Sequence, residues 1–95
     1  MRVEIRPSTS KGKKMMAVFH EGGKRVRTVH FGAAGMSDFT KHGDEQRKQN
    51  YLSRHRANED WTDPYSAGAL SRYILWNKHT LSASIADYKK RFGLS

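Results

Sequence analysis

The chain has 95 residues, of which 36% are hydrophobic and none is cysteine, and its formal net charge is +9. The absence of cysteine excludes disulfides, thiolate nucleophiles and cysteine-based zinc sites, and no apolar run approaches the roughly 20 residues that a membrane-spanning helix needs. The length fits one domain, so we expect residues 1–95 to fold as a single unit that is intracellular, not secreted and not inserted in a membrane.

The N-terminal third carries the pattern of a small antiparallel sheet. Apolar and charged side chains alternate over residues 2–6, which predicts a short strand. Two longer runs, 13–20 and 24–31, flank a Gly-Gly pair, and glycine supplies the positive φ angles that a tight hairpin needs. We therefore expect two or three strands in a β-hairpin region of residues 1–31.

Residues 32–43 are expected to form a loop that ends in a helix cap. Ser37, Asp38 and Thr40 carry oxygens that accept hydrogen bonds from backbone amides. Asp44 and Glu45 follow where the first helix should begin, and negative charge there matches the positive end of the helix dipole. We predict that this stretch anchors the first helix to the sheet.

Three helices are expected within the helical region 44–95. The first covers about 44–57, and the second lies in the most apolar segment, 66–76. Thr80 caps the third, whose apolar stripe at positions 81, 85, 88 and 92 ends at Gly93. Arg72 lies within the second helix, so we expect it to be partly buried and paired with a carboxylate, namely Asp38, Glu59 or Asp63.

Strands followed by helices predict an α+β fold, with a small antiparallel sheet packed on about three C-terminal helices. The positive charge is concentrated at the two ends of this chain. Residues 1–31 contain eight Lys and Arg residues and two acidic residues, and residues 66–95 contain five and one. Basic and acidic residues are nearly equal in number between these two segments. If the fold brings both ends to one face, their positive field suits phosphate.

Catalytic and metal sites find little support in the sequence. The five histidines never occur as H-x-H or H-x-x-x-H pairs, and no serine lies in a G-x-S-x-G elbow. Asp38, His42 and Asp44 have the side chains of a hard-cation site for phosphodiester cleavage, but the same residue types cap helices. We favour the cap, with His42 hydrogen-bonded within its loop, and expect no enzyme, metal or cofactor; a small metal-dependent nuclease is one alternative.

Basic side chains are the better candidates for a binding surface. Arg25 and Arg27 lie two apart on a strand, so they should point the same way, about 6.6–6.8 Å apart. On the first helix, Arg47 and Arg54 share a face with Tyr51 between them, and bases with an interposed aromatic suit a nucleic-acid backbone. The predicted nucleic-acid-binding residues are Lys11, Lys13, Lys14, Lys24, Arg25, Arg27, Arg47, Lys48 and Arg54.

Over residues 31–92 the sequence resembles a group of short, basic, uncharacterised proteins encoded by large DNA viruses of protists and algae. The matching stretches are "FGAAGMSDFTKH", "RKQNYLSRHRANEDWTDPY", "AG", "SRYILWNK" and "TLSASI". The resemblance implies a viral context, in which a small basic protein would meet the genome in the infected host cell or inside the virion.

We therefore expect a genome-associated protein that binds nucleic acid, DNA in preference to RNA, through phosphate contacts with little dependence on sequence. A second alternative is a structural or minor capsid protein whose basic face meets acidic viral proteins or a membrane surface. The oligomeric state is left open by the sequence.

Overall fold

The alternating segments form a three-stranded antiparallel sheet. The computed structural model describes residues 1–95, and its sheet contains β1 (Arg2–Pro7), β2 (Lys13–Glu21) and β3 (Lys24–Ala33), in that order. All three predicted strands are present, and each extends the predicted range by one or two residues.

A β-bulge interrupts the pairing of β2 with β3. His20 pairs with Arg25, and the preceding Phe19 pairs with Arg27. Val26 is therefore the extra residue, and one extra residue reverses the faces of the side chains beyond it. Arg25 shares the face of His20, whereas Arg27 shares that of Phe19. The prediction that the two arginines point the same way is wrong, because it assumed regular alternation.

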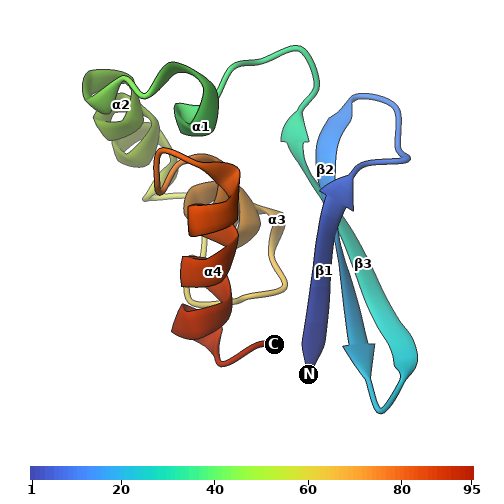
Figure 1. Cartoon of the computed structure of the whole chain (residues 1–95). Coiled ribbons are helices and arrows are strands. Elements are labelled where there is room, and N and C mark those ends of the chain that lie inside the picture. The colour runs from blue at the N-terminus through green and yellow to red at the C-terminus, as the bar shows by residue number, and fades with distance from the viewer.

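The helices follow the sheet and cover one of its faces (Figure 1). The first predicted helix is α2 (Glu45–His55), the third is α4 (Leu81–Phe92), and the second is split into α3 (Ala67–Leu70) and a π-helical turn, η1 (Ser71–Leu75). A short helix that was not predicted, α1 (Phe39–His42), lies within the expected loop. The predicted α+β fold is confirmed.

Side-chain caps fix where the four α-helices begin. The cap oxygens accept backbone hydrogen bonds in the first turn of each helix, and the residues are Asp38, Asp44, Ser66 and Thr80. Gly93 ends α4 in the left-handed conformation, with φ 66°. The predicted cap at Thr80 and the predicted stop at Gly93 are both confirmed.

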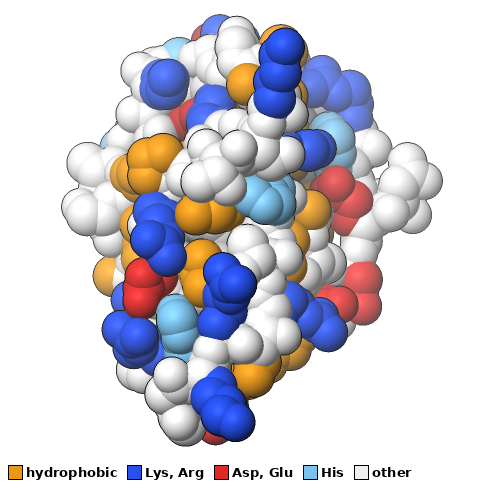
Figure 2. Space-filling view, turned by 90° about the vertical axis from the view of Figure 1, so that its right-hand side faces the viewer, with side chains coloured by type: hydrophobic (Ala, Val, Ile, Leu, Met, Phe, Trp, Pro, Cys, Tyr) orange, Lys and Arg blue, Asp and Glu red, His pale blue; other side chains and the backbone are white.

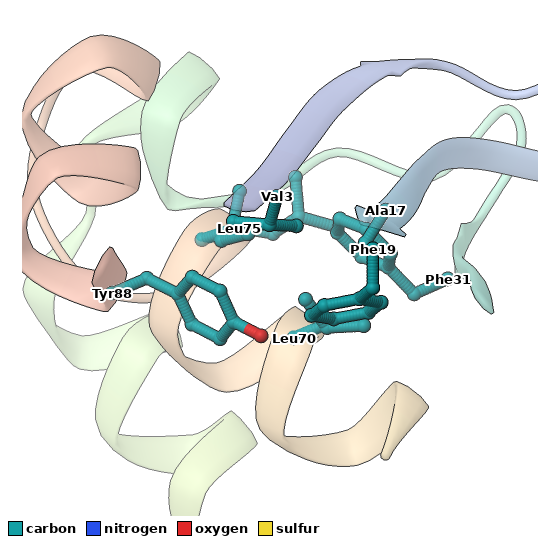
Figure 3. Packing of buried hydrophobic residues seen from close by; sticks show 8 residues of the cluster. Val3, Ala17, Phe19, Phe31, Leu70, Leu75 and Tyr88 are labelled. Atoms are coloured by element: carbon teal, nitrogen blue, oxygen red, sulfur yellow. The ribbon is translucent and has the colours of Figure 1, made fainter. Parts of the chain in front are cut away.

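The core lies between the sheet and the helices (Figure 3). Its fully buried members come from β1, β2, β3, α3, η1 and α4, and they are Val3, Ala17, Phe19, Phe31, Leu70, Ile74, Leu75 and Tyr88. The Tyr88 hydroxyl donates a 2.6 Å hydrogen bond to the Pro64 carbonyl, so the one polar atom that this ring brings into the core has a partner.

The two ends of the chain meet at the start of β1. Ser95 donates its backbone N–H to Met1 and accepts one from Val3. The chain ends lie side by side in Figure 1, but α4 is on the helical side of the sheet. Lys89 and Lys90 therefore do not add their charges to the face of the sheet that the helices leave open.

Candidate nucleic-acid interface

One face of the sheet carries no helix (Figure 1). The strand register places side chains on it in three rows of three, and the rows are Arg2–His20–Arg25, Glu4–Val18–Thr28 and Arg6–Met16–His30. With about 6.8 Å between alternate residues and about 4.8 Å between strands, these nine positions cover about 14 by 10 Å. We call this surface the open face.

The open face has an excess of positive charge. Glu4 is its one carboxylate, and that group lies 3.2 Å from the Arg2 guanidinium, 3.5 Å from that of Arg6 and 3.3 Å from Nε2 of His20. The two arginine side chains are 59% and 52% exposed, and such exposed pairs are weak. Arg25 has no ion-pair partner. A phosphate can therefore draw these arginines away from Glu4 at little cost.

The open face is hollowed by a shallow depression of about 530 Å³. Met16 and Val18 are buried between the longer side chains of the edge strands, and Arg6, Arg25 and His30 also line the depression. Figure 2 looks onto this side of the molecule and shows Lys and Arg side chains spread from top to bottom, with histidines and apolar patches between them. No large aromatic ring belongs to the nine positions.

The predicted basic residues of the hairpin region do not form one patch. Lys11 and Lys13 lie at the end of the sheet where β2 begins, and Lys24 lies at the hairpin tip, about 27 Å away along the nine residues of β2. Arg27 lies on the helical side, with its guanidinium 4.9 Å from the centre of the Tyr65 ring.

Lys14 has a structural partner rather than a free charge. Its ammonium donates hydrogen bonds of 2.5 Å to the Asp38 carboxylate and to the Met36 carbonyl. Burial alone would raise the pKa of Asp38, but the hydrogen bonds from Lys14 and Thr40 outweigh it and hold that pKa below 3.8. The pair joins β2 to the cap of α1. The stretch was predicted to anchor the helix that is α2; it instead ties the unpredicted α1 to the sheet, and α2 begins at a cap of its own, Asp44.

The basic residues of α2 separate into free and engaged side chains. Arg47 and Arg54 are exposed and form no ion pair. Lys48 donates a 2.8 Å hydrogen bond to the Asn77 carbonyl and lies over the Phe39 ring. Its partial burial lowers the pKa of Lys48, which fits a side chain that fastens α2 to the segment after η1.

Tyr51 is not available to a nucleobase, contrary to the prediction of an interposed aromatic. Its residue is only 8% exposed, and its ring stacks on Trp76, with centres 4.4 Å apart and planes 6° apart. Burial raises the pKa of Tyr51 to about 12. The spacing of Arg47, Tyr51 and Arg54 gave a common face but did not tell whether the ring on it points into the protein.

Arg72 is half-buried, as predicted, but it pairs with no carboxylate. Its guanidinium donates a 2.9 Å hydrogen bond to the Trp76 carbonyl and lies over the rings of Tyr73 and Trp61. Burial lowers the pKa of Arg72. The predicted carboxylate partner is wrong because aromatic faces and a carbonyl occupy the surroundings of this charge.

The three residues of the nuclease alternative serve the helix caps. His42 accepts the Asp44 backbone N–H at 2.9 Å through Nδ1, which confirms its predicted hydrogen bond within the loop. Asp44 caps α2, and Asp38 is held by Lys14. No group of three or more His, Asp and Glu side chains is arranged to hold a metal ion.

Arg2 and Arg6 are the open-face cations that the sequence prediction missed. The signal was present in the alternation of residues 2–6, which puts positions 2, 4 and 6 on the side away from Val3 and Ile5. Nothing in the sequence, however, shows that the helices leave this side of the sheet uncovered.

Comparison with known protein families matches residues 3–55, more than half of the chain, to a model described as "Family of unknown function (DUF5754)". No curated protein and no solved structure matches. None of the helices combines the length and apolar character needed to cross a membrane.

Proposed function

Since the chain belongs to the DUF5754 family, a family of unknown function, its role must be inferred from its own surface, and we propose that it binds nucleic acid through phosphate contacts with little dependence on sequence. The observation that carries this proposal is the uncovered sheet face, where one carboxylate is shared between Arg2 and Arg6 and a third arginine, Arg25, has no ion-pair partner. Phosphate neutralisation supplies most of the affinity of sequence-independent binding.

The open face favours the sugar-phosphate backbone over the bases. Its apolar floor is made of Met16 and Val18, and the nine positions hold no Trp, Tyr or Phe on which bases would stack. Arginine forms forked, charge-assisted hydrogen bonds with phosphate. We propose DNA in preference to RNA, and an association with a viral genome in an infected cell or a virion, on the strength of the resemblance described above.

The test is a fluorescence-anisotropy titration of labelled double- and single-stranded DNA and RNA across a salt series. A triple variant, Arg2→Ala/Arg6→Ala/Arg25→Ala, should lose up to about 2.7 from the slope of log K against log salt on a duplex, since each neutralised phosphate contributes about 0.9. The matched control is Arg47→Ala/Lys89→Ala/Lys90→Ala, which removes the same charge away from the open face.

An equal loss of slope in both triple variants would show that only net charge matters and would refute the assignment to the open face. If no nucleic acid binds at low salt, the nucleic-acid proposal itself fails. The open face would then have to serve an acidic protein partner, as the structural-protein alternative requires.

A further inference from the structure

A separate cleft of about 360 Å³ lies between the sheet and the helices. Its walls come from the start of β2, the end of β3, the loop before α1, α2 and the α3–η1 segment. Its volume is within the range of small-ligand sites, about 300–1,000 Å³. None of the nine open-face positions lines it, so it is a second and distinct site.

A stack of aromatic rings ends in this cleft. Trp76 stacks on Tyr51, and Tyr51 stacks on His55 with ring centres 4.2 Å apart. All three residues line the cleft. Trp76 lies between Tyr51 and His42, and Tyr51 lies between Trp76 and His55. The His55 side chain is 38% exposed and ends this part of the stack.

The His55 ring is held in place from outside the stack. Its Nδ1 lies 3.3 Å from the Glu59 carboxylate, which also accepts a 3.0 Å hydrogen bond from the Trp61 indole. Glu59 in turn lies against Gly68, where a Cβ would come within 2.9 Å of it. An aromatic surface fixed in this way loses little entropy when a second ring stacks on it.

The free charge around the cleft is positive. Lys13 and Arg54 line it, both are exposed, and neither forms an ion pair. The charge of Asp38 is balanced by Lys14, whereas Glu59 keeps its negative charge, because the Trp61 indole that it accepts a hydrogen bond from is neutral. Lys13, Lys14 and Arg54 therefore exceed the two carboxylates of the lining by one charge. An anionic ligand would therefore meet a small excess of positive charge, from Lys13 and Arg54, beside a ring.

We propose that the cleft binds one nucleotide, with its base on the His55 ring and its phosphate at Lys13 and Arg54. Resting on the function proposed above, this nucleotide is the unpaired terminal nucleotide of a strand whose duplex lies elsewhere on the protein. Base–aromatic stacking tolerates any base, so binding at this site should depend little on which base ends the strand.

The first experiment titrates the protein with dAMP, deoxyadenosine and inorganic phosphate, following tryptophan fluorescence and calorimetry. We expect dAMP to bind at least about 10-fold more tightly than either fragment, because only dAMP uses both the ring and the cations. No heat and no fluorescence change with about 10 mM dAMP would overturn the proposal, since a Kd above that range amounts to no site.

Two variants test the two halves of the site. Arg54→Ala should weaken the binding of dAMP about 5- to 10-fold and leave the binding of deoxyadenosine unchanged, whereas His55→Ala should weaken the binding of both. Arg47→Ala removes the same charge from the same helix without touching the cleft, and it should bind dAMP like the unaltered protein. If Arg54→Ala and Arg47→Ala behave alike, the cleft is not the site. Lys13→Ala, at an exposed strand end, repeats the test in case the α2 variants unfold.

A second set of binding measurements tests the cleft proposal separately from the proposed nucleic-acid function. A DNA hairpin with a phosphorylated single-stranded overhang should bind more tightly than its blunt form, and Arg54→Ala should abolish the difference while leaving the blunt form unaffected. Blunt DNA that binds without any gain from an overhang, and without dAMP binding, refutes the cleft proposal alone. If dAMP binds but no DNA does, the cleft serves free nucleotides, so the strand-end proposal and the proposed function both fail.

Discussion

Replacing Asp38 by alanine should destabilise the protein far more than an ordinary cap substitution does. The Asp38 carboxylate accepts hydrogen bonds from the backbone N–H and the hydroxyl of Thr40, in the first turn of α1, and it also pairs with the ammonium of Lys14 on β2. Asp38 is 1% exposed and the Lys14 side chain is 16% exposed. Alanine removes the cap and leaves a largely buried cation with only the Met36 carbonyl as a partner.

The two losses add to about 2.5–4 kcal/mol. A lost cap costs about 1 kcal/mol, and the loss of a hydrogen bond to a charged group costs about 1.5–3 kcal/mol. A chain of this size has a total unfolding free energy of about 5–14 kcal/mol, so the variant should lose a large part of it. Since 1 kcal/mol moves the Tm of such a domain by roughly 4–8 °C, the expected fall in Tm is at least about 10 °C.

The measurement is urea unfolding at equilibrium, followed by tryptophan fluorescence and circular dichroism, with Asp44→Ala as the matched control. Asp44 also caps a helix but is exposed and forms no ion pair, so its loss should cost only about 1 kcal/mol. Asp38→Asn keeps a good cap and removes only the charge, which isolates the contribution of the ion pair. If Asp38→Ala costs no more than Asp44→Ala, the Lys14–Asp38 pair contributes no stability and the reasoning is refuted.

The same pair predicts a pH dependence. The pKa of Asp38 is lower in the folded protein than its ordinary value of 3.8, because the hydrogen bonds from Lys14 and Thr40 outweigh the effect of burial. The unfolded chain therefore takes up the proton first as the pH falls. The stabilisation by this group is complete above the unfolded pKa and is lost as the pH falls through the folded one. Asp38→Asn should remove this part of the acid destabilisation.

Two further substitutions test the packing. Gly32→Ala should cost about 1–3 kcal/mol of unfolding free energy, because φ is +78° and the new Cβ would lie 2.7 Å from the Leu75 side chain. The control is Gly12→Ala, at φ +88° in open space, which should cost only about 1 kcal/mol. Equal losses in urea unfolding would contradict the contact between the new Cβ and Leu75. Tyr88→Phe should cost about 1 kcal/mol by removing the hydrogen bond to Pro64. Burial raises the pKa of Tyr88, so the stability that its neutral hydroxyl contributes is complete below pH 10 and is lost as the pH rises from there. If Tyr88→Phe leaves the alkaline unfolding profile unchanged, this contribution of Tyr88 is contradicted.

The sequence by itself determined the three strands and most of the helices of this protein, but not α1 or the π-helical turn. The strand at residues 2–6, the cap at Thr80 and the stop at Gly93 follow from neighbours only a few residues apart, because side-chain alternation, caps and positive-φ glycines act locally. The order of strands and helices then sufficed for the α+β class. Even the hydrogen bond of His42 within its loop was foreseeable, since its partner is two residues away.

Only the tertiary structure decided which of the charges are free. The bulge at Val26 separates Arg25 from Arg27, and whether Tyr51 faces solvent depends on Trp76, which is 25 positions along the chain. Lys14 is engaged because folding brings Asp38 to it, and Arg2 becomes a candidate because no helix covers its face of the sheet. The binding surface of a basic protein consists of the cations that form no internal ion pair or hydrogen bond after folding. Long-range contacts decide which cations these are, and a local sequence pattern does not show those contacts.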